Sequence, residues 1–107
     1  MKPKQVNILG VNYSIVYVDK PSEVDIFRRE SLWGQIDLWT RSIRIYDNGR
    51  PLEDVWQTII HEILHGIVAG LHIRSLSKDK DGHEAIDLLA LAIADVWFRN
   101  GWMAGLV

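Results

Sequence analysis

The sequence contains no cysteine, so any metal site must be built from histidine and carboxylate side chains rather than thiolates. The longest apolar run, residues 88–94, is too short to span a membrane, and a membrane partner is therefore not expected. Basic residues are scattered and the net charge is −2, which argues against nucleic-acid binding. The residues after Met1 do not resemble a signal peptide, and a cysteine-free chain is compatible with the cytosol, so we expect a cytoplasmic protein.

The overall composition is that of one small folded domain. The chain has 107 residues, of which 48% are hydrophobic and 24% are charged, as in ordinary globular proteins. Five tryptophans supply apolar area, which helps a short chain to form a core. We find no repeat, linker or low-complexity segment, so residues 1–107 are predicted to form a single domain.

Alternating apolar and polar residues in the first half of the chain predict two β-hairpins. The first pairs residues 6–9 with residues 13–18 across a turn at Gly10. The second pairs residues 34–39 with residues 43–46 across a turn at 40–42. The polar connector between the hairpins has room for one helical turn.

The second half of the chain has helical periodicity. One amphipathic helix is predicted from residue 52 to about residue 70, and another from about residue 83 to residue 100. The second is apolar nearly all round, so we expect it to be largely buried. Strands followed by helices predict an α+β fold, in which a small antiparallel or mixed sheet of N-terminal hairpins packs on two long helices.

The first predicted helix carries the motif HEILH, which spans His61 to His65. Two histidines four residues apart lie one turn apart on one helix face and can bind the same Zn²⁺ ion. Glu62 lies at the flank of that ion, where it can take a proton from a water molecule that the metal activates. The same face carries Asp54 and Thr58, and a polar stripe on an otherwise apolar helix indicates that the helix lines a cleft.

A catalytic zinc needs a third protein ligand, and Glu84 is the favoured candidate. It begins the second helix after a loop long enough for the two helices to pack antiparallel, with Glu84 facing the histidines. Asp87, one turn later, can orient a liganding histidine through a hydrogen bond. His83 is the alternative third ligand. His72 lies seven residues beyond His65, about 10 Å along a continuous helix, which is too far to share one ion.

The motif HEILH, followed after eighteen residues by Glu84 in HEAID, resembles the gluzincin pattern of thermolysin-type metallopeptidases. The chain is also similar to minimal gluzincins of about this length and to small phage-related proteins. The longer histidine motif of the metzincins is excluded, because Val68 and Leu71 occupy its glycine and histidine positions. The resemblance implies a minimal zincin-like fold in which His61, His65 and Glu84 bind zinc, Glu62 acts as general base and Asp87 orients a histidine.

The resemblance further implies that a peptide or protein substrate adds as an extra strand along one rim of the cleft. The matching segment here consists of Gly34, Gln35, Ile36, Asp37, Leu38 and Trp39. Related enzymes also carry a side chain that stabilises the oxyanion, for which Tyr46, His72 and His83 are candidates. We therefore expect a zinc-dependent metallopeptidase. The alternative is a non-catalytic binding module that zinc stabilises and that derives from a phage.

Overall fold

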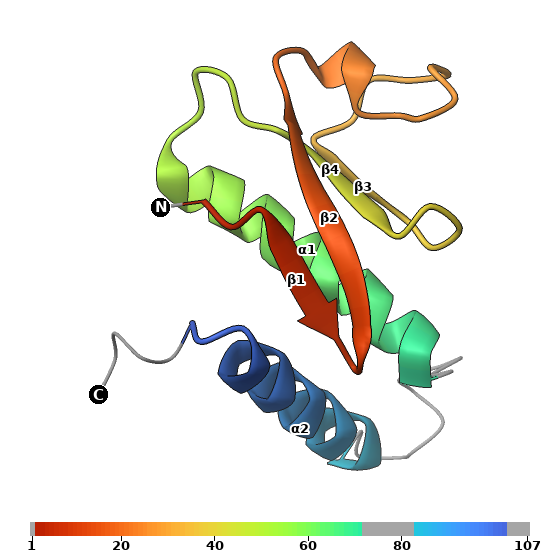
Figure 1. Cartoon of the computed structure of the whole chain (residues 1–107), viewed down its shortest axis with the longest axis vertical. Coiled ribbons are helices and arrows are strands. Elements are labelled where there is room, and N and C mark those ends of the chain that lie inside the picture. The colour runs from red at the N-terminus through yellow and green to blue at the C-terminus, as the bar shows by residue number, and fades with distance from the viewer. Residues whose placement is uncertain (1, 72–82, 103–107) are drawn as a thin grey trace.

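The structure, a computed structural model, describes residues 2–71 and 83–102, and between residues 83 and 90 it describes the backbone and only the side chain of Leu89. The elements follow in the order β1 (Gln5–Ile8), β2 (Val11–Val18), the 3₁₀ turn η1 (Pro21–Glu23), β3 (Gly34–Asp37), β4 (Ser42–Tyr46), α1 (Leu52–Leu71) and α2 (His83–Arg99). The predicted α+β class is confirmed: a mixed sheet of four strands packs with helices of 20 and 17 residues (Figure 1). None of the helices in the described ranges is long and apolar enough to cross a membrane.

The first hairpin is formed as predicted. β1 and β2 pair antiparallel, and a turn of two residues joins Ile8 to Val11. Both turn residues have positive φ, 51° at Leu9 and 91° at Gly10, as the tight turns of twisted hairpins require. The main-chain N–H of Gly10 donates to the side-chain oxygen of Asn7, which holds the turn closed.

The two hairpins join through their inner strands, an arrangement that the sequence patterns do not reveal. The strand order is β1-β2-β4-β3, and β2 pairs parallel to β4 with Ile15 opposite Ile43 and Tyr17 opposite Ile45. Ile15, Ile43 and Ile45 are buried. This order puts the most apolar strands in the middle of the sheet and leaves β1 and β3 at its two edges.

The third strand is shorter than predicted. β3 ends at Asp37, and the side chain of Asp37 accepts hydrogen bonds from the main-chain N–H of Trp39 and the hydroxyl of Thr40. A carboxylate that binds the backbone two residues later favours a turn over an extended strand. Leu38 and Trp39, which were expected in the strand, therefore lie in the turn before β4, and Trp39 is 95% exposed.

Helix α1 packs its apolar face on the sheet. Val55, Ile59, Ile63 and Ile67 recur at every fourth position and are all buried. The spacing places them along one side of the helix, where they meet the inward-facing residues of the sheet. The helix contacts the strands β3, β4 and β1 and the helix α2. Its flank next to β3 carries the polar side chains of Thr58, His61, Glu62 and His65.

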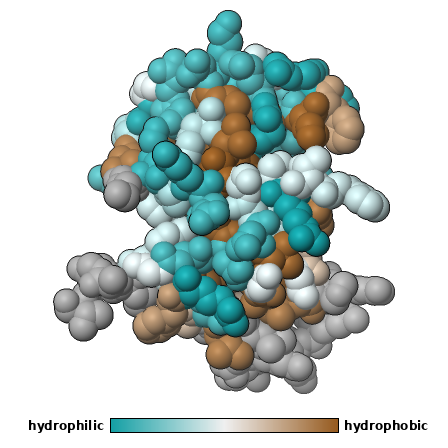
Figure 2. Space-filling view, in the orientation of Figure 1, coloured by the Kyte–Doolittle hydropathy of each residue, from teal (hydrophilic) through white to brown (hydrophobic). Residues whose placement is uncertain are grey.

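Helix α2 runs antiparallel to α1 (Figure 1), as predicted. Its C-terminal end is fixed by Trp102, whose ring packs edge-on against the rings of Trp56 and Trp97 at centroid distances of 5.5 and 5.0 Å. The expectation that this helix is largely buried is wrong for its described part, because Leu91 and Phe98 are each 71% exposed. The helix contacts β1 and α1, which cover one side of it, and apolar side chains reach the surface over α2 (Figure 2).

The outer edge of β1 is occupied by a side chain of the segment that ends α2. The amide oxygen of Asn100 accepts from the main-chain N–H of Asn7 at 2.9 Å, and its amide nitrogen donates to the carbonyl of Asn7 at 3.0 Å. An amide that bonds both main-chain groups of one residue takes the place of a neighbouring strand at that point. The outer edge of β1 is therefore closed to a further strand at Asn7.

A buried carboxylate ties the segment after η1 to β3. The side chain of Asp25 is 0% exposed and accepts hydrogen bonds from the main-chain N–H groups of Phe27 and Arg29 and from the side-chain amide of Gln35. The Gln35 side chain in turn accepts from the N–H of Ile26. The hydrogen bond from Phe27 is the largest influence on Asp25 and lowers its pKa to about 2, although burial acts in the opposite direction. Asp25 therefore helps to hold the edge strand.

We expect Asp25→Asn to lower the free energy of unfolding at neutral pH and to make it less dependent on pH in the acid range. Because the folded-state pKa of Asp25 is about 2, below its ordinary value of 3.8, the stabilisation from this carboxylate is present above pH 3.8 and is lost as the pH falls towards 2. Urea unfolding of wild type and variant between pH 7 and 2 tests this. The difference in unfolding free energy should shrink below pH 3.8, and a difference that stays constant would contradict the assignment.

Candidate functional site

His61 and His65 lie on consecutive turns of α1 and present their rings to the same point. Their Nε2 atoms are 3.1 Å apart and their ring centroids 4.7 Å apart. Both side chains are exposed, although the helix that carries them is packed on the sheet. Their convergence is set by the helix, because residues four apart stand one above the other on one face.

The separation of the two imidazole nitrogens matches that of two ligands of one metal ion. Nitrogen ligands at about 2.0–2.1 Å from a tetrahedral zinc lie about 3.3 Å from each other. The observed 3.1 Å between the Nε2 atoms is close to that value. The donor set, two imidazoles without a thiolate, also suits zinc. The histidine pair therefore fits a zinc site for which it supplies two of the ligands.

Glu62 lies against β3 at Gly34 and is only 6% exposed. Its Oε2 lies 4.0 Å from the Nε2 of His61. Burial raises the pKa of Glu62, while His61, His65 and the main-chain N–H of Ile36 favour the charged form and act in the opposite direction. If the histidine pair held a metal ion, a buried carboxylate at this distance from the pair would be placed to exchange a proton rather than to bind the ion.

The absence of a side chain at Gly34 brings β3 close to α1. A Cβ atom at this position would lie 2.7 Å from Cγ2 of Thr58 and 3.1 Å from both Cγ and Oε2 of Glu62. Such distances to a buried threonine and a buried glutamate are below van der Waals contact. Glycine is therefore required here for the strand to pass directly over the face of the helix that carries Thr58 and Glu62.

The predicted rim of the cleft is brought together with the histidine motif over part of its length. A cavity of about 460 Å³ is lined by the following residues of β3, its turn and α1: Gly34, Gln35, Ile36, Leu38, His61, Glu62, His65 and Ala69. Asp37 lies in β3 but uses its carboxylate within the turn. Trp39 projects into solvent and does not line this cavity. The rim therefore consists of Gly34, Gln35, Ile36 and Leu38.

The remaining predicted site residues lie outside the described side chains. Glu84, Asp87 and His83 belong to the first turns of α2, for which the structure describes the backbone alone, and His72 lies outside the described residues. The described contacts of α2 involve its later residues, and none of them includes His61 or His65. Within the described residues, no third histidine or carboxylate completes a metal-binding group. The third ligand therefore stays a prediction.

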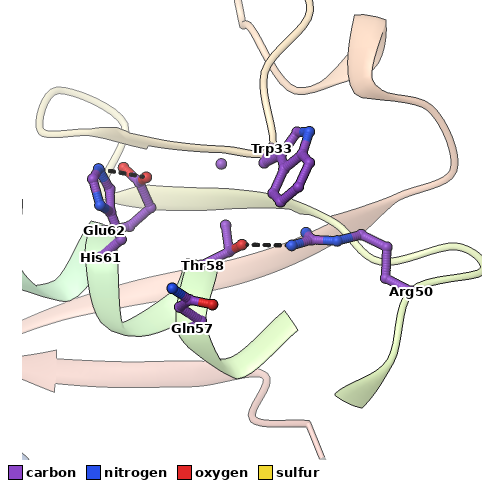
Figure 3. A pocket seen from close by; sticks show the side chains of 7 residues that line it. Trp33, Arg50, Gln57, Thr58, His61 and Glu62 are labelled. Atoms are coloured by element: carbon purple, nitrogen blue, oxygen red, sulfur yellow. Dashed lines mark hydrogen bonds and ion pairs between the residues drawn. The ribbon is translucent and has the colours of Figure 1, made fainter. Parts of the chain in front are cut away.

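A second cavity, of about 320 Å³, adjoins the motif on the N-terminal side of α1 and reveals residues that the sequence patterns did not indicate. It is lined by Gly34, Gln57, Thr58, His61 and Glu62, and also by Trp33 and Arg50 (Figure 3). Trp33 precedes β3 and Arg50 precedes α1, so neither belongs to a periodic element. Their only sequence signal was their position next to the rim strand and the motif helix.

Tyr46, one candidate for stabilising an oxyanion, lies at the end of β4. Its ring centroid is 5.7 Å from the guanidinium carbon of Arg50, and its main-chain carbonyl accepts a hydrogen bond from the same side chain. Tyr46 is not among the residues that line either cavity beside the histidine motif. Its described role is to support Arg50.

Comparison of the chain with family models, with curated proteins and with solved structures gave no match. The gluzincin resemblance therefore rests on the motif and on its spacing to Glu84. The geometry around His61, Glu62 and β3 provides independent grounds for a functional proposal.

We expect Gly34→Ala to destabilise the protein by about 1–3 kcal/mol, because the new methyl group must displace Thr58 or Glu62. Gly70→Ala is the matched control. There the nearest atom is the terminal Cδ1 of Leu9 at 3.2 Å, and alanine in a helix is favoured over glycine by up to about 1 kcal/mol. Thermal or urea unfolding of both variants measures the difference. Equal stability of Gly34→Ala and wild type would show that β3 does not press against α1.

Proposed function

We propose that this protein is a zinc-dependent metallopeptidase of the gluzincin kind. The observation that carries the proposal is the convergence of the His61 and His65 Nε2 atoms at 3.1 Å, next to a buried Glu62 and under an edge strand. Each part has a separate use in peptide hydrolysis, namely to hold the metal, to move the proton and to bind the substrate main chain. A histidine pair without the glutamate or the strand would not favour this function over simple metal binding.

In the proposed site, His61, His65 and Glu84 hold the zinc ion, and Asp87 orients one of the histidines. Zinc bound there would lower the pKa of a water molecule and polarise the carbonyl of the scissile bond. Glu62 accepts the proton of the attacking water and then donates it to the nitrogen of the leaving amine. The low solvent exposure of Glu62 favours this role, because burial raises the proton affinity of its carboxylate.

The substrate is proposed to bind in an extended conformation along β3. The main-chain carbonyl of Trp33 accepts from Tyr46 of β4, and hydrogen bonding alternates along an antiparallel pair, so Gly34 and Ile36 direct their main-chain groups away from β4. The main-chain groups of Gly34 and the carbonyl of Ile36 are available to an added strand, whereas the N–H of Ile36 faces the Glu62 carboxylate. The opposite edge of the sheet is occupied at Asn7 by the side chain of Asn100, which favours β3 as the edge for substrate.

The proposed place of action is the cytoplasm, in keeping with a cysteine-free sequence whose site uses only histidine and carboxylate ligands. The proposed partner is a peptide or an unfolded segment of protein. An extended segment can pair with β3, whereas a folded substrate would present few free main-chain groups.

We expect the purified protein to bind about one zinc ion per chain, and His65→Ala and Glu84→Ala each to lose it. His83→Ala is the matched control and should keep the metal, because in this ligand set His83 takes no part. The protein is dialysed against zinc and passed through a gel-filtration column, and metal analysis then measures the zinc content per chain. Loss of zinc in His83→Ala but not in Glu84→Ala would reverse the assignment of the third ligand, and a wild type without zinc would exclude the metal site.

We expect Glu62→Gln to keep zinc and the fold but to slow peptide cleavage by at least ~100-fold, since a glutamine cannot accept the proton. Cleavage of an unstructured protein such as denatured casein, followed by mass spectrometry, gives the rate. This variant also separates the peptidase from the alternative of a zinc-stabilised binding module, in which no cleavage is seen with either protein. Equal rates of wild type and Glu62→Gln would exclude Glu62 as the base.

A further inference from the structure

The cavity between Trp33 and Arg50 lies directly beside the histidine motif and the edge strand. At about 320 Å³ it is at the small end of the ~300–1,000 Å³ of ligand pockets, a size that suits one side chain rather than a large molecule. Gly34 forms part of its wall, so a peptide lying along β3 passes its opening. A substrate side chain can therefore enter it from the strand.

Arg50 is fixed in this cavity by several hydrogen bonds. One terminal nitrogen donates to the carbonyl of Tyr46 at 2.6 Å, and the other donates to the carbonyl of Asp54 at 3.1 Å and to the hydroxyl of Thr58 at 2.8 Å. The guanidinium also lies 4.4 Å from the ring centroid of Trp33. These contacts fix the position of the charge before any ligand arrives, which lowers the entropy lost on binding.

The charge of Arg50 is not neutralised by a neighbouring carboxylate in the described part of the chain. The ion pairs found there involve Lys2, Arg29, His61 and Arg99, and none involves Arg50. A guanidinium has five N–H donors, and the described bonds of Arg50 use three of them. Its partners are neutral carbonyl and hydroxyl oxygens, so the cavity retains a positive charge and free donors.

The two ends of the cavity carry different side chains. His61 and Glu62 lie at one end, and Trp33 and Arg50 lie at the other, with Gln57 and Thr58 of α1 between them (Figure 3). In the proposed mechanism the first end belongs to the zinc ion and to the proton transfer by Glu62, so the charge that is left for a substrate side chain is that of Arg50 at the second end. Trp33 is 63% exposed and offers an apolar wall for the carbon atoms that lead to such a group.

We propose that this cavity is a specificity subsite that binds the carboxylate side chain of an aspartate or glutamate in the peptide substrate. The proposal rests on the proposed peptidase function and adds the substrate class: peptides with an acidic residue close to the scissile bond. Arg50 binds the carboxylate through its free N–H donors, and the Gln57 side chain is placed to contribute another donor. Arg50 is a binding residue in this scheme, whereas Glu62 performs the proton transfer.

The test uses the zinc-loaded protein and pairs of peptides that differ only by glutamate or glutamine at one position, taken in turn along the sequence. For wild type we expect kcat/KM to favour the glutamate peptide by about 10- to 100-fold at one position. Arg50→Gln should reduce this ratio to near one, and Arg50→Lys should leave an intermediate ratio because it keeps the charge but not the fork. Each peptide is prepared in two forms, one with a free C-terminus and one with an amidated C-terminus.

Arg44→Gln is the matched control. Arg44 also donates to two main-chain carbonyls, those of Val24 and Glu23, but it does not line the cavity. For Arg44→Gln, the ratio of kcat/KM for the glutamate peptide to that for the glutamine peptide should equal the wild-type ratio. If Arg50→Gln fails to fold, a lower ratio in Arg50→Lys than in wild type tests the same role of Arg50. Equal rates for glutamate and glutamine peptides at every position would overturn the subsite, and so would a preference that follows the free C-terminus instead of the side chain.

A binding measurement separates this subsite from the peptidase proposal. In zinc-loaded Glu62→Gln protein, the glutamate peptide should shift the indole N–H resonance of Trp33, which Trp33→Phe identifies, and the glutamine peptide should not. This shift without cleavage of any peptide by wild type would support the subsite and exclude the peptidase. Cleavage by wild type without the shift and without an acidic preference would exclude the subsite and leave the peptidase in place.

Discussion

Thr58 and Glu62 of α1 reach the backbone of β3 at Gly34, where a Cβ atom would lie only 2.7 Å from the threonine methyl. This close approach brings an edge strand over the polar face of the motif helix. It buries Glu62 without covering His61 and His65, because the strand meets one flank of the helix and leaves the neighbouring flank open. A bulkier residue at position 34 would separate the strand from the helix and expose the glutamate to solvent.

In the proposed function, one edge of the sheet is closed to further strands and the other binds the substrate. At β1, the Asn100 side chain bonds both main-chain groups of Asn7 and so prevents further strand pairing at that residue. At β3, Gly34 and Ile36 direct main-chain groups towards the cleft. Asp25 supports this second edge through Gln35. An extended peptide that pairs with β3 would lie between the histidine pair and the Trp33–Arg50 cavity, which links the proposed chemistry to the proposed specificity.

The candidate site joins two kinds of positive charge that act at different places. A metal ion on His61 and His65 would act on the scissile bond, whereas Arg50 lies at the far end of the adjoining cavity and would act on a side chain. Arg50 is held by neutral oxygens and by the Trp33 ring, so its charge remains available. In the proposed function, one loop residue that precedes the motif helix would in this way provide substrate preference.

Local patterns in the sequence determined the hairpins, the two helices and the histidine motif, because strand and helix periodicities and the spacing of His61 and His65 are set by the backbone alone. Tertiary structure decided the parallel pairing of β2 with β4, the burial of Glu62 and the approach of Trp33 and Arg50, since these depend on which surfaces meet. The turn formed by Asp37 shortened β3, and the exposure of Leu91 and Phe98 followed from packing on one side of α2. Periodicity identifies the faces of an element, but only the packing of distant segments determines what each face contacts.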